Sequence, residues 1–95
     1  MVIGIMELQL ALYDNSSLKA KRSVVKRVIH RCRHTFNVAA AEVEDQDATD
    51  RATIGVVAIG NDHRYIQGTL DKVEDFVERL AIAEVLDAPK IVETY

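Results

Sequence analysis

The order in which two hydrophobic periods alternate along the chain constrains its fold most strongly. Strict alternation of side chains predicts strands, because successive strand residues point to opposite faces, whereas apolar residues three and four apart predict helices. Along this chain the pattern changes from strand to helix, then to two strands, a second helix and a last strand. The sequence therefore predicts the element order β-α-β-β-α-β.

These elements have clear expected bounds. We expect strands at residues 2–13, 37–44, 51–60 and 84–92, and a first helix at residues 18–35. A second helix should start at His63, after the turn and cap at Gly60-Asn61-Asp62, with an apolar stripe from Ile66 to Leu80. Ser17 is the expected N-cap of the first helix, at the end of the polar turn that begins at Asp14, because its hydroxyl can accept a hydrogen bond from a free backbone N–H. Pro89 lacks a ladder donor, which favours an edge position for the last strand.

Connections of this kind predict a ferredoxin-like α+β sandwich, in which two helices cover one face of a four-stranded antiparallel sheet. A chain of 95 residues supports one core, so we expect a single domain over residues 1–95. No apolar run approaches the ~18 residues of a membrane span. The single cysteine, Cys32, excludes an internal disulfide, and the first residues lack the basic region of a secretory signal. We therefore expect a cytoplasmic protein without a membrane partner.

Two helices leave the other face of the sheet uncovered. The third strand is apolar on both faces, which is typical of a strand covered on both sides. The first and third strands would place four aliphatic residues near the middle of the uncovered face: Ile3, Ile5, Val57 and Ile59. An apolar patch of this kind usually marks an interface, so the sequence predicts a homodimer that forms through these residues.

Positive charge is concentrated in the first helix, although the whole chain has a net charge of −3. Seven of the twelve basic residues, and no acidic residue, lie between Asn15 and Ala41. On a helix, the cations Lys19, Arg22, Lys26 and Arg33 share an arc of about 80° with His30. Such a row can contact successive nucleic-acid phosphates, with Ser17 and Lys21 contributing at the helix start. Phosphate contact is expected, and base readout is not, because no aromatic residue precedes Phe36 in this segment.

An alternative for the basic row is pairing within the fold itself. The second helix is rich in acidic residues and lies beside the first helix in a ferredoxin-like sandwich. Its carboxylates could neutralise the row and leave only a solvated basic face.

Five short motifs serve as landmarks along the chain: Ser17-Leu18-Lys19-Ala20-Lys21-Arg22, Phe36-Asn37-Val38, Ala41-Glu42-Val43, Asp45-Gln46-Asp47 and Gly60-Asn61-Asp62. In this order and spacing the chain resembles the YlxP-like family of small bacterial proteins, which corresponds to domain of unknown function 503. The resemblance implies a ferredoxin-like fold and a dimer. Genes of the family often lie beside those of translation and ribosome-maturation factors, which favours an RNA-linked role. The resemblance supplies no catalytic residues.

The sequence contains no recognisable catalytic constellation, so we predict neither an enzyme nor a cofactor. His30, Cys32 and His34 suggest a metal site, but on a helix the cysteine points away from the two histidines. The carboxylates of the central hairpin are expected to be solvated. Two functions remain: an accessory protein that contacts RNA or ribosomal phosphate through the first helix, and a non-enzymatic regulatory or structural homodimer that binds an acidic protein, or a small ligand at the subunit interface.

Overall fold

The computed structural model describes residues 1–13 and 17–95. The elements are, in chain order, β1 (Val2–Ala11), α1 (Leu18–Thr35), β2 (Ala39–Glu44), β3 (Arg51–Gly60), α2 (His63–Leu80), β4 (Glu84–Asp87) and β5 (Lys90–Thr94). The predicted alternation of strands and helices is confirmed, with the last strand divided in two. The start of the predicted turn, Asp14 to Ser16, lies outside the described residues, whereas Ser17 is the N-cap of α1.

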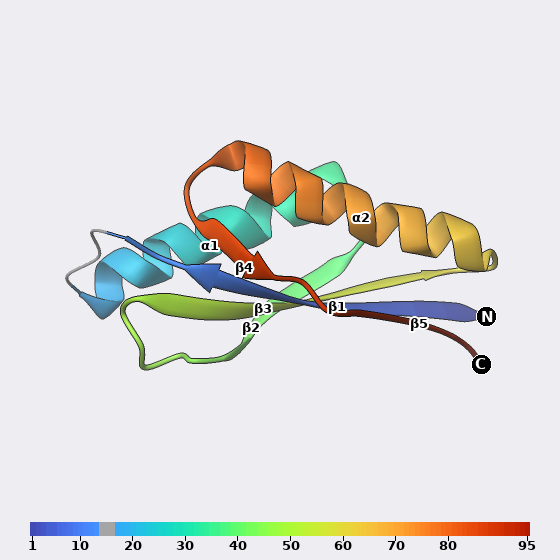
Figure 1. Cartoon of the computed structure of the whole chain (residues 1–95), viewed down its shortest axis with the longest axis horizontal. Coiled ribbons are helices and arrows are strands. Elements are labelled where there is room, and N and C mark those ends of the chain that lie inside the picture. Colours follow the sequence, from blue (N-terminus) through green and yellow to red (C-terminus); the bar gives the residue numbers. More distant parts are fainter. Residues whose placement is uncertain (14–16) are drawn as a thin grey trace.

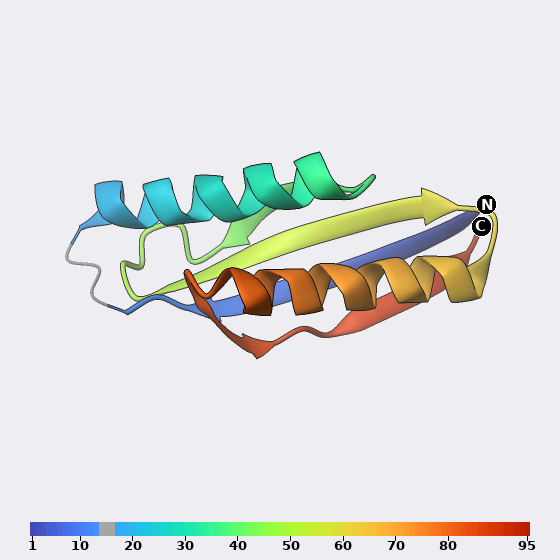
Figure 2. The same ribbon diagram turned by 90° about the horizontal axis from the view of Figure 1, so that it is seen from above.

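All strand pairs are antiparallel. The strands follow the order β2-β3-β1-β4, and β5 also pairs with β1. Figure 1 shows both helices above the sheet, and Figure 2 shows them side by side over that face, with α1 above β2 and α2 toward β4 and β5. The predicted α+β sandwich is therefore confirmed, with one face of the sheet uncovered.

The division of the last strand occurs at Ala88 and Pro89. The pairing of β1 with β4 shifts its register between Gln9 and Leu10, and pairing with β5 resumes at Met6 opposite Lys90. Pro89 cannot donate to a ladder, but its carbonyl accepts a hydrogen bond from Glu7 N at 3.1 Å. The edge position predicted from Pro89 is confirmed, because among the described strands β4 and β5 pair with β1 alone.

The core lies between the sheet and the two helices. Side chains of β1 and β3 that point toward the helices are fully buried, among them Met6, Leu8 and Ile54. Gly4 lets α2 approach the backbone of β1, since a Cβ atom there would lie 2.4 Å from Cγ2 of Ile66. The uncovered face follows from the same alternation, because the intervening residues of each strand point the other way.

Local chemistry fixes the bounds of α1. Ser17 has an extended backbone, and its Oγ accepts a hydrogen bond from Ala20 N at 3.1 Å. The helix then buries one stripe, made of Lys21, Val25, Val28 and Cys32. It ends at Phe36, whose ring packs edge-to-face on Phe76 of α2 with centroids 5.4 Å apart. The bounds predicted for this helix agree with those observed.

Candidate phosphate-binding helix and open sheet face

The basic row on α1 consists of Lys19, Arg22, Lys26 and Arg33, and all four side chains are exposed. At 1.5 Å per residue the row extends about 21 Å along the helix axis. Within residues 1–13 and 17–95, none of the four cations forms an ion pair. Their charge is therefore directed to solvent and available to a ligand.

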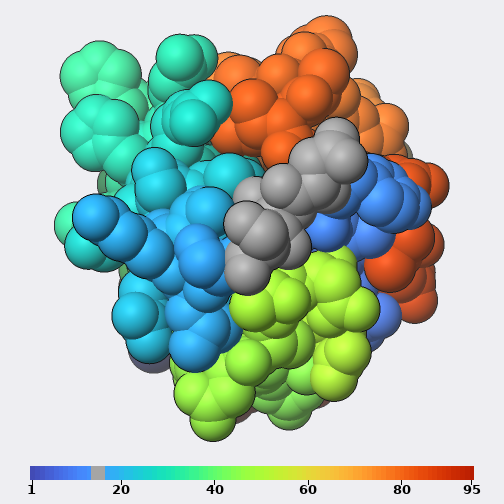
Figure 3. Space-filling model, turned by 90° about the vertical axis from the view of Figure 1, so that its left-hand side faces the viewer, coloured from blue at the N-terminus to red at the C-terminus, as the bar shows by residue number. Residues whose placement is uncertain are grey.

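The basic row points away from α2. Counting 100° per residue from the buried stripe places these cations on the flank of α1 that overhangs β2, while Val24 lies on the flank toward α2. Figure 3 looks at the end of the molecule where α1 begins, and there the blue side chains at the start of α1 project to the left, away from the orange helix α2 at the top right. An incoming polyanion therefore meets the row without crossing α2.

The carboxylates of α2 have a different partner. Lys90 of β5 forms ion pairs with Glu74 and, at 3.5 Å, with Asp71. Burial alone would lower the pKa of Lys90, but the hydrogen bonds and negative charge of Glu74 and Asp71 outweigh it, so the pKa is raised. No ion pair joins α1 to α2 in the described part of the chain. The alternative in which α2 neutralises the basic row is thus not observed.

Lys21 corrects the predicted set of phosphate-binding residues. Its side chain is fully buried, with an exposed fraction of 0%, and Nζ lies 2.7 Å from Glu42 Oε2 of β2. The same ammonium donates a hydrogen bond to the carbonyl oxygen of Asp45. Lys21 therefore joins α1 to the β2–β3 hairpin and is not accessible to phosphate. The signal was in the sequence, because Lys21 precedes Val25 by four residues and shares its stripe.

Glu42 depends on this ammonium. Its Oε2 is out of contact with solvent, and no donor among the described residues is aligned to hydrogen-bond it. The charge of Lys21 is consequently the main compensation for burying the carboxylate.

Asp45 continues the same network on the hairpin. Its carboxylate accepts hydrogen bonds from Arg51 Nε at 3.2 Å and from Thr53 Oγ1 at 3.0 Å. Its backbone is in the left-handed region with φ of 63°, which Asp tolerates better than most residues. The expectation that the hairpin carboxylates are all solvated is wrong for Glu42 and Asp45, which hold the hairpin to α1 and β3.

A shallow depression of about 480 Å³ lies on the exposed side of α1, lined by Lys26, Ile29, His30, Arg33 and His34. The rings of His30 and His34 stack with centroids 6.0 Å apart, whereas Cys32 is in the core. Burial raises the pKa of the Cys32 thiol to about 11. Among the described residues, no three metal-ligating side chains converge. The depression therefore extends the cationic surface of the basic row.

Ser17 is at the start of the row and is exposed. Its Oγ already accepts a hydrogen bond from Ala20 N. A hydroxyl can donate while it accepts, so the Ser17 O–H stays available to an anion.

The uncovered face of the sheet carries an apolar row across all four neighbouring strands. Strand register places Ala39, Val57, Ile5 and Ile91 opposite one another in that order. Ile3 and Ile59 form the next pair along β1 and β3. The exposed fractions of Ile5, Val57 and Ile59 are 42%, 40% and 57%, while Ile3 is half-buried. The four residues predicted from the sequence therefore lie together on one open, apolar half of the face.

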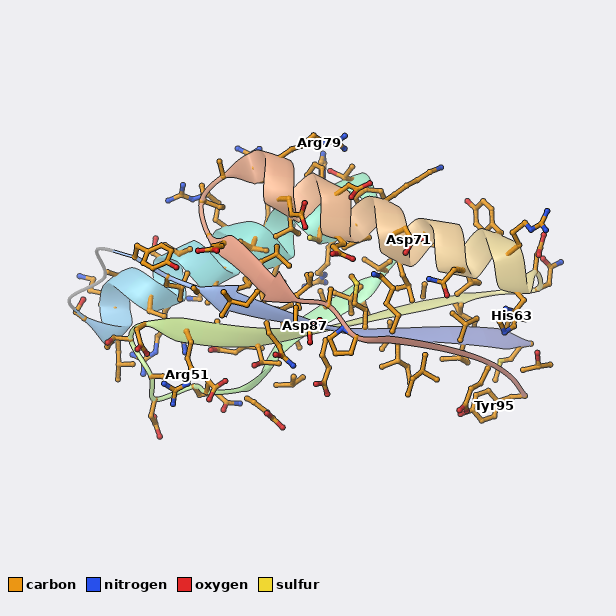
Figure 4. The ribbon with its side chains drawn as sticks, viewed as in Figure 1. Arg51, His63, Asp71, Arg79, Asp87 and Tyr95 are labelled. Carbon is orange, nitrogen blue, oxygen red and sulfur yellow. The ribbon has the colours of Figure 1, made fainter. Side chains whose placement is uncertain are left out.

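The other half of this face is mixed, because the exposed side chains of Leu86 and Val43 lie there among polar residues. Gln9 is opposite Thr53 on one side and Asp87 on the other, and Glu44 is opposite Thr53. Figure 4 shows Tyr95 extending below the sheet, on the side away from the helices, at the aliphatic end of the face, where Thr94 is opposite Val2. The two halves of the face therefore differ in their proportion of polar residues, with Gln9, Glu44 and Asp87 in one and the aliphatic row in the other.

The hydropathy of the helices and a contact between the start of α2 and the sheet also bear on function. No helix of the described residues combines the length and apolar character needed to cross a lipid bilayer. His63, the first residue of α2, has Nε2 3.0 Å from the carbonyl oxygen of Val92 on β5. This contact connects the start of α2 to the sheet edge.

The sheet order, the two helices and the exposed basic row define a ferredoxin-like α+β protein with a cationic helix. Solved structures agree with this class: the chain is similar to a protein called YJCS, with a TM-score of 0.55 and 10% identity over 98% of this chain and 99% of that one. It is also similar to a de novo designed protein with a ferredoxin fold, with a TM-score of 0.53 and 16% identity over 100% of this chain and 87% of the other.

The sequence comparison is more specific. The chain belongs to the family described as Protein of unknown function (DUF503), whose model matches residues 3–89. It is 34% identical over 77 residues to the uncharacterized protein YlxP of Bacillus subtilis (strain 168). The aligned residues cover 81% of this chain and 84% of that protein. The family resemblance expected from the sequence landmarks is therefore confirmed.

Proposed function

We propose that this protein is a homodimeric accessory protein that contacts RNA or ribosomal phosphate through α1. Lys19, Arg22, Lys26 and Arg33 bind successive phosphates, and Ser17 donates to a phosphate at the helix start. The observation that carries the proposal is the exposure of all four cations on a flank that faces away from the carboxylates of α2. The landmarks shared with YlxP-like proteins, whose genes often lie beside those of translation factors, favour RNA as the polyanion.

Counterion release sets the expected strength of this contact. Each phosphate neutralised on a single strand contributes about 0.7 to the slope of log affinity against log salt. Four contacts give a slope of about −3, so affinity should fall about 50-fold between 50 and 200 mM salt. A small-ligand site would lack this dependence.

The test is a fluorescence-anisotropy titration of a labelled single-stranded RNA. We expect Arg22→Glu/Lys26→Glu to lower affinity roughly tenfold or more, since it removes two phosphate contacts and adds repulsion. The control, Arg64→Glu/Arg79→Glu, reverses two exposed charges on α2 with the same change in net charge. Absence of RNA binding by the unmodified protein at low salt, or an equal loss in the control, would contradict the proposal.

The proposed dimer forms face to face through the apolar half of the open sheet face. The whole open face measures about 30 Å along the central strands and about 19 Å across four strands, or about 570 Å² in plan. This is below the ~800 Å² per partner of a stable interface, so the proposed contact extends beyond the apolar half. The helices cover the opposite side of the sheet. Two copies joined in this way would therefore leave both basic rows in solvent, so the dimer and the phosphate contact are compatible.

Substituting one residue of the apolar row tests the dimer. Val57→Asp places an unpaired carboxylate in the centre of the interface, and we expect it to shift the protein to monomer in sedimentation velocity. Gln9→Asp adds the same charge outside the aliphatic row, among Glu44 and Thr53, and should leave the dimer intact. A monomeric unmodified protein at micromolar concentration would refute this part of the proposal.

A further inference from the structure

A second pocket lies where the end of α1, the end of β3 and the first half of α2 meet. Its volume is about 240 Å³. It arises because β2 begins at Ala39, opposite Val57, so that the last residues of β3 continue beyond their neighbour. On the β2 side of these last residues of β3 lies the segment that links α1 to β2, and not a paired strand. The side chains that matter here are Thr35, Phe36, Asn37, Tyr65, Thr69 and Lys72.

The pocket has an apolar floor and a polar rim. Ile66 and Ala58 at the floor are almost fully buried, and Phe36 is half-buried. The rim carries the exposed side chains of Asn37 and Tyr65, and Tyr65 has an exposed fraction of 69%. This combination of an aromatic wall with a few convergent polar groups is typical of a ligand site.

The polar groups of the rim are free to bind. Within residues 1–13 and 17–95, the side chains of Asn37, Tyr65 and Lys72 form no hydrogen bond or ion pair. Thr69 donates its hydroxyl to the Tyr65 carbonyl at 3.0 Å, which fixes the turn of α2 beside the pocket. An amide that can both donate and accept, a phenol and an ammonium therefore surround one small apolar space.

These groups match one unpaired nucleobase. Bases in single-stranded RNA stack on aromatic side chains and are hydrogen-bonded at their edges. Tyr65 and Phe36 supply aromatic surface, and the Asn37 amide can pair with a base edge. Lys72 can contact the adjoining phosphate. The small volume suits a single base better than the larger ligands for which pockets of ~300–1,000 Å³ are usual.

The pocket lies beyond the same end of α1 at which the basic row stops. Arg33, the last cation of the row, precedes Thr35 at the pocket by two residues, or about 3 Å along the helix axis, but the two side chains lie about 160° apart around the helix. A strand whose phosphates follow the row therefore reaches the pocket by passing around the C-terminal end of α1. We propose that this pocket receives one unpaired base of a single-stranded RNA whose backbone lies along α1. This inference rests on the proposed phosphate contact and adds base stacking to it.

The experiment uses single-stranded RNA containing 2-aminopurine, whose fluorescence is quenched by stacking, together with a duplex of the same length. The unmodified protein should change the 2-aminopurine emission on binding. Tyr65→Ala should abolish this change and weaken single-strand binding about tenfold, within the range that stacking contributes, while duplex affinity stays constant. Tyr65→Phe keeps the ring and should retain the emission change. Tyr95→Ala removes a similarly exposed tyrosine elsewhere and is the matched control.

The outcomes separate this inference from the proposed function. Loss of binding to both RNA forms in Arg22→Glu/Lys26→Glu, with no effect of Tyr65→Ala on either, would keep the phosphate contact and overturn the base pocket. Absence of binding to any RNA would overturn both. Shifts of pocket resonances with adenosine monophosphate, without preference for single-stranded over duplex RNA, would identify a free-nucleotide site and overturn the RNA assignment.

Discussion

Replacing Lys21 by Met removes a charge while keeping a side chain of similar length in the core. The ammonium has no contact with solvent and lies 2.7 Å from Glu42 Oε2. Without it, the Glu42 carboxylate loses its compensating charge and the Asp45 carbonyl loses its donor. We therefore expect Lys21→Met to destabilise the fold, although it removes one positive charge from a crowded basic helix.

The magnitude follows from the burial of the pair. Removing one partner of a buried ion pair costs about 3–5 kcal/mol. The Glu42 side chain retains an exposed fraction of 18%, so water relieves part of this cost. We expect a loss of about 3 kcal/mol, at the lower end of that range. For a domain of this size, such a loss lowers Tm by about 12–24 °C.

Urea unfolding followed by circular dichroism measures this loss as a change in midpoint. Lys19→Met removes an exposed cation from the same helix and should change stability by less than about 0.5 kcal/mol. Lys21→Met/Glu42→Leu removes both charges and should recover most of the stability, since apolar replacement of a whole buried pair is often neutral. If Lys21→Met and Lys19→Met unfold at the same urea concentration, the buried pair does not hold α1 to the hairpin.

Packing around two glycines and the burial of Cys32 can be tested by stability and labelling measurements. A Cβ at Gly68 meets no atom within 4 Å, so Gly68→Ala should stabilise the protein by about 0.5–1 kcal/mol in urea unfolding, because alanine favours the helix. A Cβ at Gly4 would lie 2.4 Å from Ile66 Cγ2, so Gly4→Ala should destabilise it by about 1–3 kcal/mol and lower Tm in calorimetry; an unchanged Tm would disprove this tight approach of α2 to β1. Cys32 has a pKa raised from 9.0 to about 11 by burial, so a thiol reagent at pH 8 should label the folded protein far more slowly than the unfolded chain. Because this thiol ionises first in the unfolded state, stability should also fall as pH rises from about 9 to 11.

The helices and the central strands could be predicted because each carries a single clear period. The first helix has an N-cap at Ser17 and an apolar stripe that ends at Phe36, so its bounds were evident. The third strand was equally clear from its doubly apolar alternation. The division of the last strand was less accessible: Pro89 indicated an edge, but the register shift depends on how β1 pairs with β4 and β5.

The candidate site was predictable only in part. Helical phase correctly placed Lys19, Arg22, Lys26 and Arg33 on an exposed surface. The assignment of Lys21 to the phosphate-binding set was wrong, because it followed from the charge of the residue and not from its position in the buried stripe. A buried lysine is tolerated there because Glu42, on a strand distant in the sequence, pairs with it. The partner of the α2 carboxylates depends on Lys90, which tertiary packing brings beside α2.

The base pocket could not be predicted from any local pattern. It combines residues from the end of α1, the link to β2, β3 and α2, which are separated by up to about forty positions in the chain. Tyr65 appears in the sequence only as a polar-face residue of an amphipathic helix. The proposed role of Tyr65 depends on where β2 begins beneath α1, and strand bounds are set by pairing rather than by local propensity.

The most direct test of the account is a nuclear magnetic resonance titration of isotopically labelled protein with short single-stranded RNA. We expect the amide and side-chain signals of Lys19, Arg22, Lys26 and Arg33 to shift together and to recover as salt is added. Signals of the open sheet face, such as Ile5 and Val57, should stay in place. Shifts confined to that face, or none along α1 at low salt, would contradict the claim that the exposed cations of this helix bind phosphate.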